Sequence, residues 1–308
     1  MRKIAAFLLA LLLLPDPVPL PTLPPAQLEE SPAPTAPVSL PRKKASVKGA
    51  EAVMVTMDDV LIAKGWRRGD SCYVPVRALC DFFGQELRWS GDREKFSLHI
   101  DALSVYGVRG QAYYTADGRY IWAPEGWLIR EGELYLPCGA LQKLFNLDAA
   151  AGKGGAVAFS SANMQLLEGG LDYYDLNFST ENIYWLTHII NAEARSEPLE
   201  GQIGVGNVVM NRVESERFPD TVYEVVYDTE HTIQFEPVAL GGIRDDPSEQ
   251  AVTAAYLVLE GANTVGDSLY FVNPDYGSAW FDAALELTVA IGHHNFYREK
   301  QNDAKQGD

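Results

Sequence analysis

The sequence contains little cysteine: only Cys72, Cys80 and Cys138 occur among its 308 residues, and none follows residue 138. An odd number of cysteines cannot pair completely, so a framework of disulfide bonds does not support this fold. The three side chains fit best as small buried apolar groups. The alternative is a single disulfide bond, which would leave one free thiol.

Basic residues are also scarce, with 25 Lys and Arg against 42 Asp and Glu and a formal net charge of −17. From Ser179 to the end there are 22 acidic and 7 basic residues, so this part alone carries −15. Such a surface repels phosphates, which argues against nucleic acid as a partner. Solubility outside the cell explains the acidic surface better than a role in binding cations.

Long apolar runs are missing except at the start, where residues 4–14 read IAAFLLALLLL after the charged opening MRK. This run has the pattern of a secretory signal and is too short for an ordinary membrane span. No small-x-small cleavage site follows. Residues 1–22 are therefore expected to be either a signal peptide or an uncleaved N-terminal anchor that tethers an exported protein to the membrane.

Proline is concentrated in one place, with ten prolines between Pro15 and Pro41. This stretch has too few large apolar residues to fold and too many prolines to stay helical. It predicts an extended spacer of polyproline character, which we assign to a linker at residues 23–50.

An internal repeat follows in residues 51–165. The segments SCYVPVRALCDFFG and ELYLPCGALQKLFN align without gaps at an offset of 62 residues. Each copy predicts a short strand that ends at proline and a helix after it, and strand-like runs such as VMVTM, FSLHI and AVAFS lie around them. This pattern indicates a duplicated α+β module.

The repeat resembles the domain named after the N-terminal part of copper amine oxidases. No copper site is expected, because His99 is its only histidine. The resemblance implies a binding or spacing role, with the cell wall or a protein as the partner.

Beyond a linker near residues 169–177 the pattern becomes helical. Ser179 or Thr180 can cap a helix that starts near Glu181, and Pro198 would end this helix or begin the next one. The next helix, residues 199–213, carries three glycines in its first half, which predicts close packing beneath the first helix. Asn207 and Asn211 lie one turn apart in this apolar stretch and are expected to be buried, supporting hydrogen-bonding residues.

The first of these helices places acids on its apolar side. Glu193 and Glu197 share an arc with apolar residues, and an unpaired buried charge costs several kcal/mol. Glu193 is therefore either the buried partner of Arg212 or Arg195, or a group that lines a cleft. An acid in an apolar pocket has a raised pKa and can donate a proton. The apolar residues of this arc are Ile183, Leu186, Ile189, Ile190 and Ala194.

Two later segments, HTIQFEPV and SLYFVNPDYGSAWF, combine aromatic and amide side chains in turn-like settings. Aromatic rings stack on the faces of sugar rings, and amides bond to hydroxyl groups. Together with Glu193, they predict cleavage of a sugar chain. The candidate substrate-binding residues are Gln234, Phe235, Tyr270, Asn273, Tyr276 and Trp280.

The segments NAEARSEPLEGQIGVGNVVMNRV, FPDTVYEVVY, QFEPV, LYFVNP and IGHHNFY resemble, in order and spacing, the SleB/CwlJ type of cell wall hydrolase, the spore cortex-lytic enzymes. The resemblance covers residues 183–297. It implies a mostly helical, lysozyme-like catalytic domain at residues 179–300, followed by a tail at residues 301–308. One residue departs from the usual pattern: Ser196 stands where a glycine is expected.

The resemblance also implies the chemistry. Glu193 would be the single catalytic acid/base of a lytic transglycosylase, which cleaves peptidoglycan between N-acetylmuramic acid and N-acetylglucosamine and leaves a 1,6-anhydro end. The protein would act in the cell wall or spore envelope, in sporulation or germination. No cofactor and no metal are expected. Glu197 is expected to support the site, through Arg212.

Three alternatives stay open. A hydrolytic muramidase would need a second carboxylate roughly 5–10 Å from that of Glu193. Glu197, Glu230 and Glu236 are the candidates for it. A zinc amidase would use the histidines, but no HxxxH or HxH spacing occurs. A peptidoglycan-binding protein without catalysis would keep the aromatic residues. The four histidines of this region are His188, His231, His293 and His294.

Overall fold

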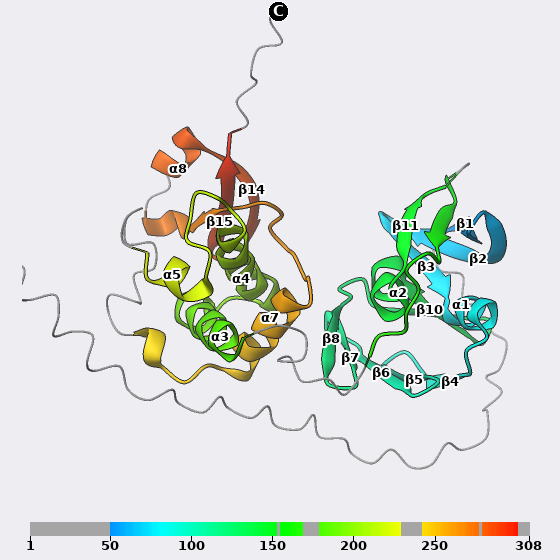
Figure 1. Ribbon diagram of the computed structural model, residues 1–308. Coiled ribbons are helices and arrows are strands. Elements are labelled where there is room, and N and C mark those ends of the chain that lie inside the picture. The colour runs from blue at the N-terminus through cyan, green and yellow to red at the C-terminus, as the bar shows by residue number, and fades with distance from the viewer. Residues whose placement is uncertain (1–49, 153–154, 169–178, 229–241, 277–278, 301–308) are drawn as a thin grey trace, which may run out of the picture. The chain divides into compact units, whose positions relative to one another are not determined.

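The computed structural model describes residues 50–152, 155–168, 179–228, 242–276 and 279–300 (Figure 1). Below, the N-terminal module means residues 50–168, and the C-terminal region means residues 179–300. The predicted signal or anchor, the proline-rich linker and the C-terminal tail lie outside the described residues. Within the described ranges, no helix is long and apolar enough to cross a membrane.

The predicted repeat forms the centre of the N-terminal module. Strand β3 (Ser71–Pro75) runs into helix α1 (Val76–Phe83), and strand β10 (Glu133–Pro137) runs into helix α2 (Cys138–Phe145). The two strands pair antiparallel, with Tyr73 opposite Pro137 and Pro75 opposite Tyr135. This register exchanges equivalent positions of the two copies, so an approximate two-fold axis passes between them. The strand–proline–helix pattern is confirmed in both.

Two sheets build the rest of the module. The order of the larger sheet is β11-β12-β1-β2-β3-β10-β9, and the order of the smaller is β4-β5-β6-β7-β8. The runs VMVTM, FSLHI and AVAFS lie in β1, β5 and β12, as expected. The remaining strands are β1 (Glu51–Met57), β2 (Val60–Arg68), β4 (Leu87–Gly91), β5 (Lys95–Ile100), β6 (Leu103–Val108), β7 (Tyr113–Ala116), β8 (Arg119–Trp122), β9 (Leu128–Arg130), β11 (Asp148–Ala151) and β12 (Val157–Ser160).

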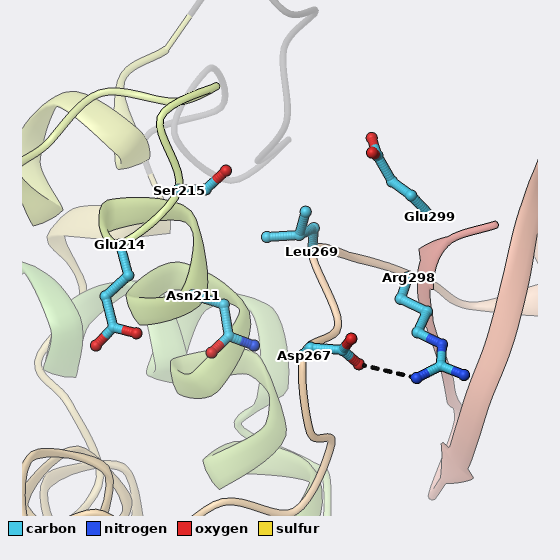
Figure 2. Close-up of a pocket in the computed structure, with 7 residues that line it drawn as sticks. All are labelled: Asn211, Glu214, Ser215, Asp267, Leu269, Arg298 and Glu299. Atoms are coloured by element: carbon cyan, nitrogen blue, oxygen red, sulfur yellow. Dashed lines mark hydrogen bonds and ion pairs between the residues drawn. The ribbon is translucent and has the colours of Figure 1, made fainter. Parts of the chain in front are cut away.

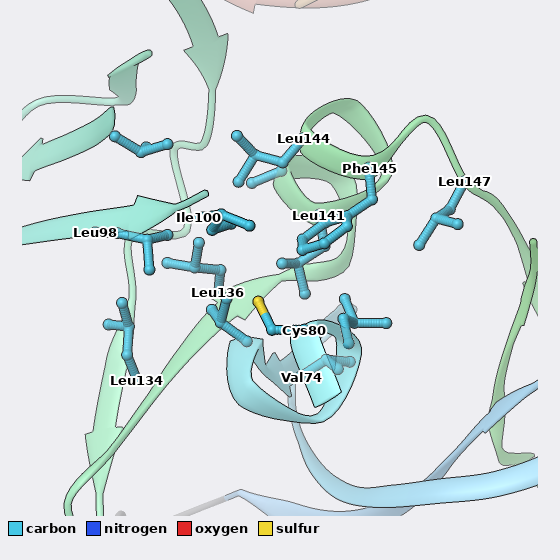
Figure 3. Close-up of a cluster of buried hydrophobic side chains, with 14 of the residues drawn as sticks. Val74, Cys80, Leu98, Ile100, Leu134, Leu136, Leu141, Leu144, Phe145 and Leu147 are labelled. Carbon is cyan, nitrogen blue, oxygen red and sulfur yellow. The ribbon is translucent and has the colours of Figure 1, made fainter. Parts of the chain in front are cut away.

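The core of the module joins the two repeat helices to both sheets. Figure 3 shows Leu98 and Ile100 of β5 facing side chains of α2 and β10. Alternate residues of β5 are buried, because successive side chains of a strand point to opposite faces. All three cysteines are thiols; Cys80 is buried and the other two are partly buried.

The C-terminal region combines helices with a small sheet. Helices α3 (Thr180–Ala194), α4 (Leu199–Val213) and α7 (Glu249–Leu259) pack on one another, and α5 (Val222–Val226) contacts the first two. The segments LYFVNP and IGHHNFY contribute strands to an antiparallel sheet of order β13-β15-β14. The domain was expected to be mostly helical, and the structure adds this three-stranded sheet to its helices. Its other elements are η2 (Gly242–Arg244), β13 (Tyr270–Val272), η3 (Pro274–Tyr276), α8 (Ala279–Ala284), β14 (Leu285–Ile291) and β15 (His294–Glu299).

The glycines of α4 serve three different contacts. A Cβ atom at Gly206 would lie 2.9 Å from Ile190 of α3, whereas one at Gly204 would lie 2.8 Å from Phe296 of β15. At Gly201 it would lie 3.2 Å from the Cβ atom of Glu197. The prediction of close packing against the first helix thus holds for Gly206. Gly204 instead lets the small sheet approach the opposite side of α4.

Candidate active site

Helix α3 carries Glu193 in its last turn. The helix starts as expected, since the Ser179 side chain accepts a hydrogen bond from the backbone N–H of Asn182 at 3.0 Å. Glu193 is partly buried. The opposite side of the helix is covered as well, because His188 and Asn191 are both buried. Glu193 therefore belongs to a helix inside the region.

The buried polar residues of α3 have local partners. The Nδ1 atom of His188 lies 2.8 Å from the carbonyl oxygen of Tyr184, and Asn191 accepts a hydrogen bond from the backbone N–H of Ser248 at the start of α7. Burial lowers the pKa of His188, and the charge of Asp246 opposes this. These contacts fix the helix on the side away from Glu193.

Arg212, in the last turn of α4, is the cation of the site. Its side chain is buried, and its Nε atom donates a hydrogen bond to the carbonyl oxygen of Leu269 at 2.8 Å. Burial lowers its pKa to about 10, and the charges of Tyr270, Asp228 and Glu193 oppose that shift. Arg212 thus stays positive at neutral pH, within electrostatic reach of two acids. The sequence left open whether Glu193 is a buried partner of Arg212 or a group that lines a cleft, and the structure brings Glu193 within electrostatic reach of the buried Arg212.

Aromatic rings flank Arg212. Its guanidinium carbon lies 5.1 Å from the centre of the Phe218 ring and 5.7 Å from that of Tyr270, and these two rings are 6.3 Å apart. A cation over ring faces gains attraction from the ring quadrupole, most of all when it is desolvated. Tyr270, predicted from the sequence, therefore belongs to the same group of residues as Arg212.

A hollow of about 870 Å³ lies along the end of α4, the following loop and α5. Phe218, Tyr227 and Asp228 line it, so it shares two residues with the surroundings of Arg212. Tyr227 belongs to a ring cluster, with its centre 4.8 Å from Tyr223 and 5.3 Å from Trp185. The lining of the hollow thus combines two aromatic rings with polar and acidic side chains.

A smaller hollow of about 340 Å³ lies between α4 and β15. Figure 2 shows Asn211 of α4 and Glu214, which directly follows α4, across from Arg298 of β15; Arg298 forms an ion pair with Asp267 at 3.5 Å. Asn211 is partly buried and donates hydrogen bonds to the carbonyl oxygens of Gly266 and Ser268. Its amide thus holds the segment before β13.

Asn207 is buried one turn earlier in α4. It donates to the carbonyl oxygen of Ala262 at 2.8 Å and accepts from the backbone N–H of Thr264 at 3.0 Å. Both asparagines therefore join α4 to the loop between α7 and β13. That loop leads to Leu269, whose carbonyl oxygen binds Arg212.

The structure corrects the expected role of Glu197. This residue was expected to act through Arg212, but its carboxylate accepts a hydrogen bond from the backbone N–H of His293 at 2.8 Å and lies 3.0 Å from the Nδ1 atom of the same residue. The physical reason is the end of α3 at Ala194. Glu197 lies in the turn beyond it, so its side chain no longer follows the helical direction of Glu193.

The other predicted substrate-binding residues are only partly described. Asn273 accepts a hydrogen bond from the backbone N–H of Asp275 and forms a turn, and Trp280 is 65% exposed on α8. The side chain of Tyr276 lies outside the described residues, as do Gln234 and Phe235. Of the predicted set, the structure places Tyr270 beside Arg212.

Sequence reasoning missed Phe218, Tyr227 and Asp228. All three lie in or directly after the segment FPDTVYEVVY, which was used only to support the resemblance. An acid that directly follows an aromatic residue at the end of a short helix was the available signal.

Comparison with known proteins places this site in a family. Residues 196–297 match the model of a family described as cell wall hydrolases, and this match begins three residues after Glu193. The chain is 31% identical over 204 residues to a spore cortex-lytic enzyme of Oceanobacillus iheyensis, which covers 66% of this chain and 70% of the relative. The chain belongs to the cell wall hydrolase family.

Two further comparisons are shorter. A spore cortex-lytic enzyme of Bacillus subtilis is 35% identical over 119 residues, which is 39% of this chain and 38% of that protein. The solved catalytic domain of the germination-specific lytic transglycosylase SleB from Bacillus anthracis is 32% identical, with a TM-score of 0.36. The match covers 39% of this chain and 97% of the solved domain.

Proposed function

We propose that this protein is a lytic transglycosylase that cleaves the glycan strands of peptidoglycan between N-acetylmuramic acid and N-acetylglucosamine. The observation that carries the proposal is Glu193, partly buried in the last turn of α3 and within electrostatic reach of the buried Arg212. The names of the relatives support spore cortex as the substrate.

In the proposed reaction Glu193 acts first as an acid and then as a base. Its proton passes to the glycosidic oxygen as the bond to the anomeric carbon breaks. The 6-hydroxyl of the same N-acetylmuramic acid then attacks that carbon, and Glu193 takes the hydroxyl proton, which closes the 1,6-anhydro ring. A tethered nucleophile has a high effective molarity, so a second catalytic carboxylate is not required.

Arg212 and Asp228 fit this role for Glu193. A cation alone would favour the ionised form of a nearby carboxylic acid and would work against proton donation. Asp228 also lies within electrostatic reach of Arg212, so its negative charge attracts the guanidinium group. Asp228 thus offsets part of the arginine charge beside the proposed acid.

The proposal also includes the roles of the two regions, the export of the protein and the residues that bind the sugar chain. We propose that residues 179–300 form the catalytic domain, that residues 51–165 form a module that places it on the wall or on a partner, and that the protein is exported. Gln234, Phe235, Tyr270, Asn273, Tyr276 and Trp280 are proposed to bind the sugar chain.

The test replaces Glu193 with Gln, which keeps the shape of the side chain and removes its proton chemistry. Cleavage of purified spore-cortex peptidoglycan should fall by about 10²- to 10⁴-fold. The matched control is Glu133→Gln in the module, where the acid forms an exposed ion pair with Arg77 at 3.1 Å. The control should cleave like the parent protein.

Mass spectrometry of the products identifies the reaction. Anhydro ends support the transglycosylase, reducing ends indicate a hydrolase, and released stem peptides indicate an amidase, whose activity a chelator would also remove. Equal release of glycan fragments by Glu193→Gln and by the parent protein would overturn the role of Glu193.

A further inference from the structure

The turn between α3 and α4 contains a buried carboxylate that the proposed reaction does not use. Glu197 follows the end of α3, and its backbone N–H donates to the carbonyl oxygen of Ala194 at 2.9 Å. Only 4% of its side chain is exposed. Burying a carboxylate costs several kcal/mol unless hydrogen bonds compensate, so this acid must have partners in the folded protein.

The partner of Glu197 comes from the other end of the C-terminal region. One carboxylate oxygen accepts the backbone N–H of His293 at 2.8 Å, and the other lies 3.0 Å from the Nδ1 atom of that histidine. His293 sits in the hairpin between β14 and β15, 96 residues further along the chain. The carboxylate therefore ties the end of α3 to the small sheet.

Gly292 makes this contact sterically specific. A Cβ atom there would lie 1.9 Å from the Oε2 atom of Glu197, and the residue has a φ of +58°, which favours glycine. The carboxylate thus fills the space that the missing side chain leaves. We call Glu197, Gly292 and His293 the carboxylate clamp.

Side chains from two more helices hold the backbone of the same turn. The amide of Gln202 in α4, which is fully buried, donates to the carbonyl oxygen of Glu197 at 3.1 Å, and Gln250 of α7 donates to the same oxygen at 3.4 Å. The turn after Glu193 is therefore fixed by α4, by α7 and by the hairpin.

Helix α3 ends before Pro198 without a left-handed residue at its C-cap. Its C-cap residue, Arg195, keeps right-handed helical angles, and no basic side chain lies in the last turn. A helix end without a left-handed residue cannot form the Schellman or αL capping bonds, so its last carbonyl groups need other partners. The position of the last turn, which carries Glu193, must then come from contacts outside the helix.

We propose that Glu197 is a positioning residue, which through the carboxylate clamp holds the last turn of α3 and so sets the place of Glu193 against the scissile bond. The inference rests on the proposed role of Glu193. A displacement of about 1 Å of a catalytic group can cost about 100-fold in rate, so a clamp on the following turn has a direct effect on kcat.

The test is a graded series of variants at position 197. Glu197→Gln keeps an oxygen that can accept the His293 backbone N–H, whereas Glu197→Ala removes both contacts. We expect kcat on solubilised glycan strands to fall about 10-fold in Glu197→Gln and about 100-fold in Glu197→Ala, with KM within about twofold of the parent value. His293→Ala, which keeps the backbone N–H, should have the smallest effect.

A matched control separates positioning from loss of stability. Val265→Ala removes two methyl groups from a fully buried side chain that packs on α4 at Gly204 and belongs to none of the contacts of the clamp. It should reduce the urea midpoint of residues 179–300 without lowering kcat per folded molecule. A purely structural Glu197 would behave in the same way, and that result would overturn the inference.

The outcomes also separate this inference from the proposed function. If Glu193→Gln is inactive and the Glu197 variants keep the parent kcat when folded, only the clamp is wrong. If Glu193→Gln cleaves normally, the proposed function is wrong, and the clamp then has no catalytic group to position.

Discussion

The N-terminal module and the C-terminal region differ in how many polar side chains they bury. Among the described residues, ten polar or charged side chains are buried; nine of them lie in the C-terminal region and one, Arg119, lies in the N-terminal module. The module instead fills its core with aliphatic and aromatic side chains. Both regions have enough apolar residues to fold, so the buried polar groups are not needed to complete a core.

This difference supports the proposal that the C-terminal region carries the chemistry. A buried polar group must find a partner, and a network of such groups is retained where it does something that an apolar core cannot do. In the C-terminal region the hydrogen bonds of these groups connect α3 with α7, α4 with the loop before β13, and the turn after α3 with the hairpin between β14 and β15. The module resembles a scaffold, in which strand pairing and apolar packing suffice.

The largest effect on stability should come from Arg212→Met. The variant leaves Glu193 and Asp228 near a site without its cation, and breaking a buried charge pair on one side costs about 3–5 kcal/mol. The loss of stability is measured by urea denaturation, monitored through the amide hydrogen exchange of peptides from residues 179–228. Cleavage should fall as well.

The module supplies the comparison for that variant. Arg77 forms an exposed ion pair with Glu133, and exposed pairs contribute little. Arg77→Met should leave the urea midpoint of its own region unchanged. Equal effects of the two variants would remove the contrast between the regions.

An intermediate effect is expected from glycines in two helices. Gly204→Ala in α4 would place a Cβ atom 2.8 Å from Phe296 and Val265, and overpacking costs about 1–3 kcal/mol. Gly139→Ala in α2 meets nothing within 4 Å and should stabilise the module, since alanine is the better helix former. Thermal unfolding of both variants tests whether α4 is packed more closely at Gly204 than α2 is at Gly139.

The smallest effect should appear with pH. Burial lowers the pKa of His188 in the folded protein from its ordinary value of 6.5, so the fold favours the neutral ring. Its contribution to stability is present above pH 6.5 and is lost as the pH falls from there toward the lowered pKa. The urea midpoint of residues 179–300 should therefore decrease between pH 7.5 and pH 5.5, roughly.

His188→Gln should make the urea midpoint fall less between these two pH values. The difference from the parent protein should be smaller than the change in urea midpoint that Gly204→Ala causes. The matched control is His99→Gln in the module, where the ring lies between the hydroxyl groups of Ser97 and Ser104. It should leave the pH dependence of residues 179–300 as it is in the parent protein. An unchanged pH profile in His188→Gln would show that other groups carry the acid sensitivity.

Local signals predicted the local structure well. Proline at the end of each repeat strand marked the starts of α1 and α2, Ser179 marked the start of α3, and Pro198 marked the start of α4. These residues act through their own φ angle or through a hydrogen bond to the next turn, so a short stretch of sequence is enough.

Contacts between distant segments were harder to predict. Glu197 was expected to meet Arg212, 15 residues away, but it binds His293, 96 residues away. Likewise, the three glycines of α4 suggested one close neighbour, and the structure gives them different neighbours. Such pairings depend on how complete elements pack, and the residue types at either end do not specify them.

The sequence by itself determined the duplicated strand–helix pattern, the starts of the main helices and an acid among apolar residues at position 193, because each depends on neighbours within a few residues. Only the tertiary structure decided that Arg212 is buried within electrostatic reach of that acid, that Phe218, Tyr270 and Asp228 gather around Arg212, and that a hairpin holds the turn after the acid. The physical reason is that burial and charge pairing depend on distances in space, which the folded chain sets between residues far apart in sequence.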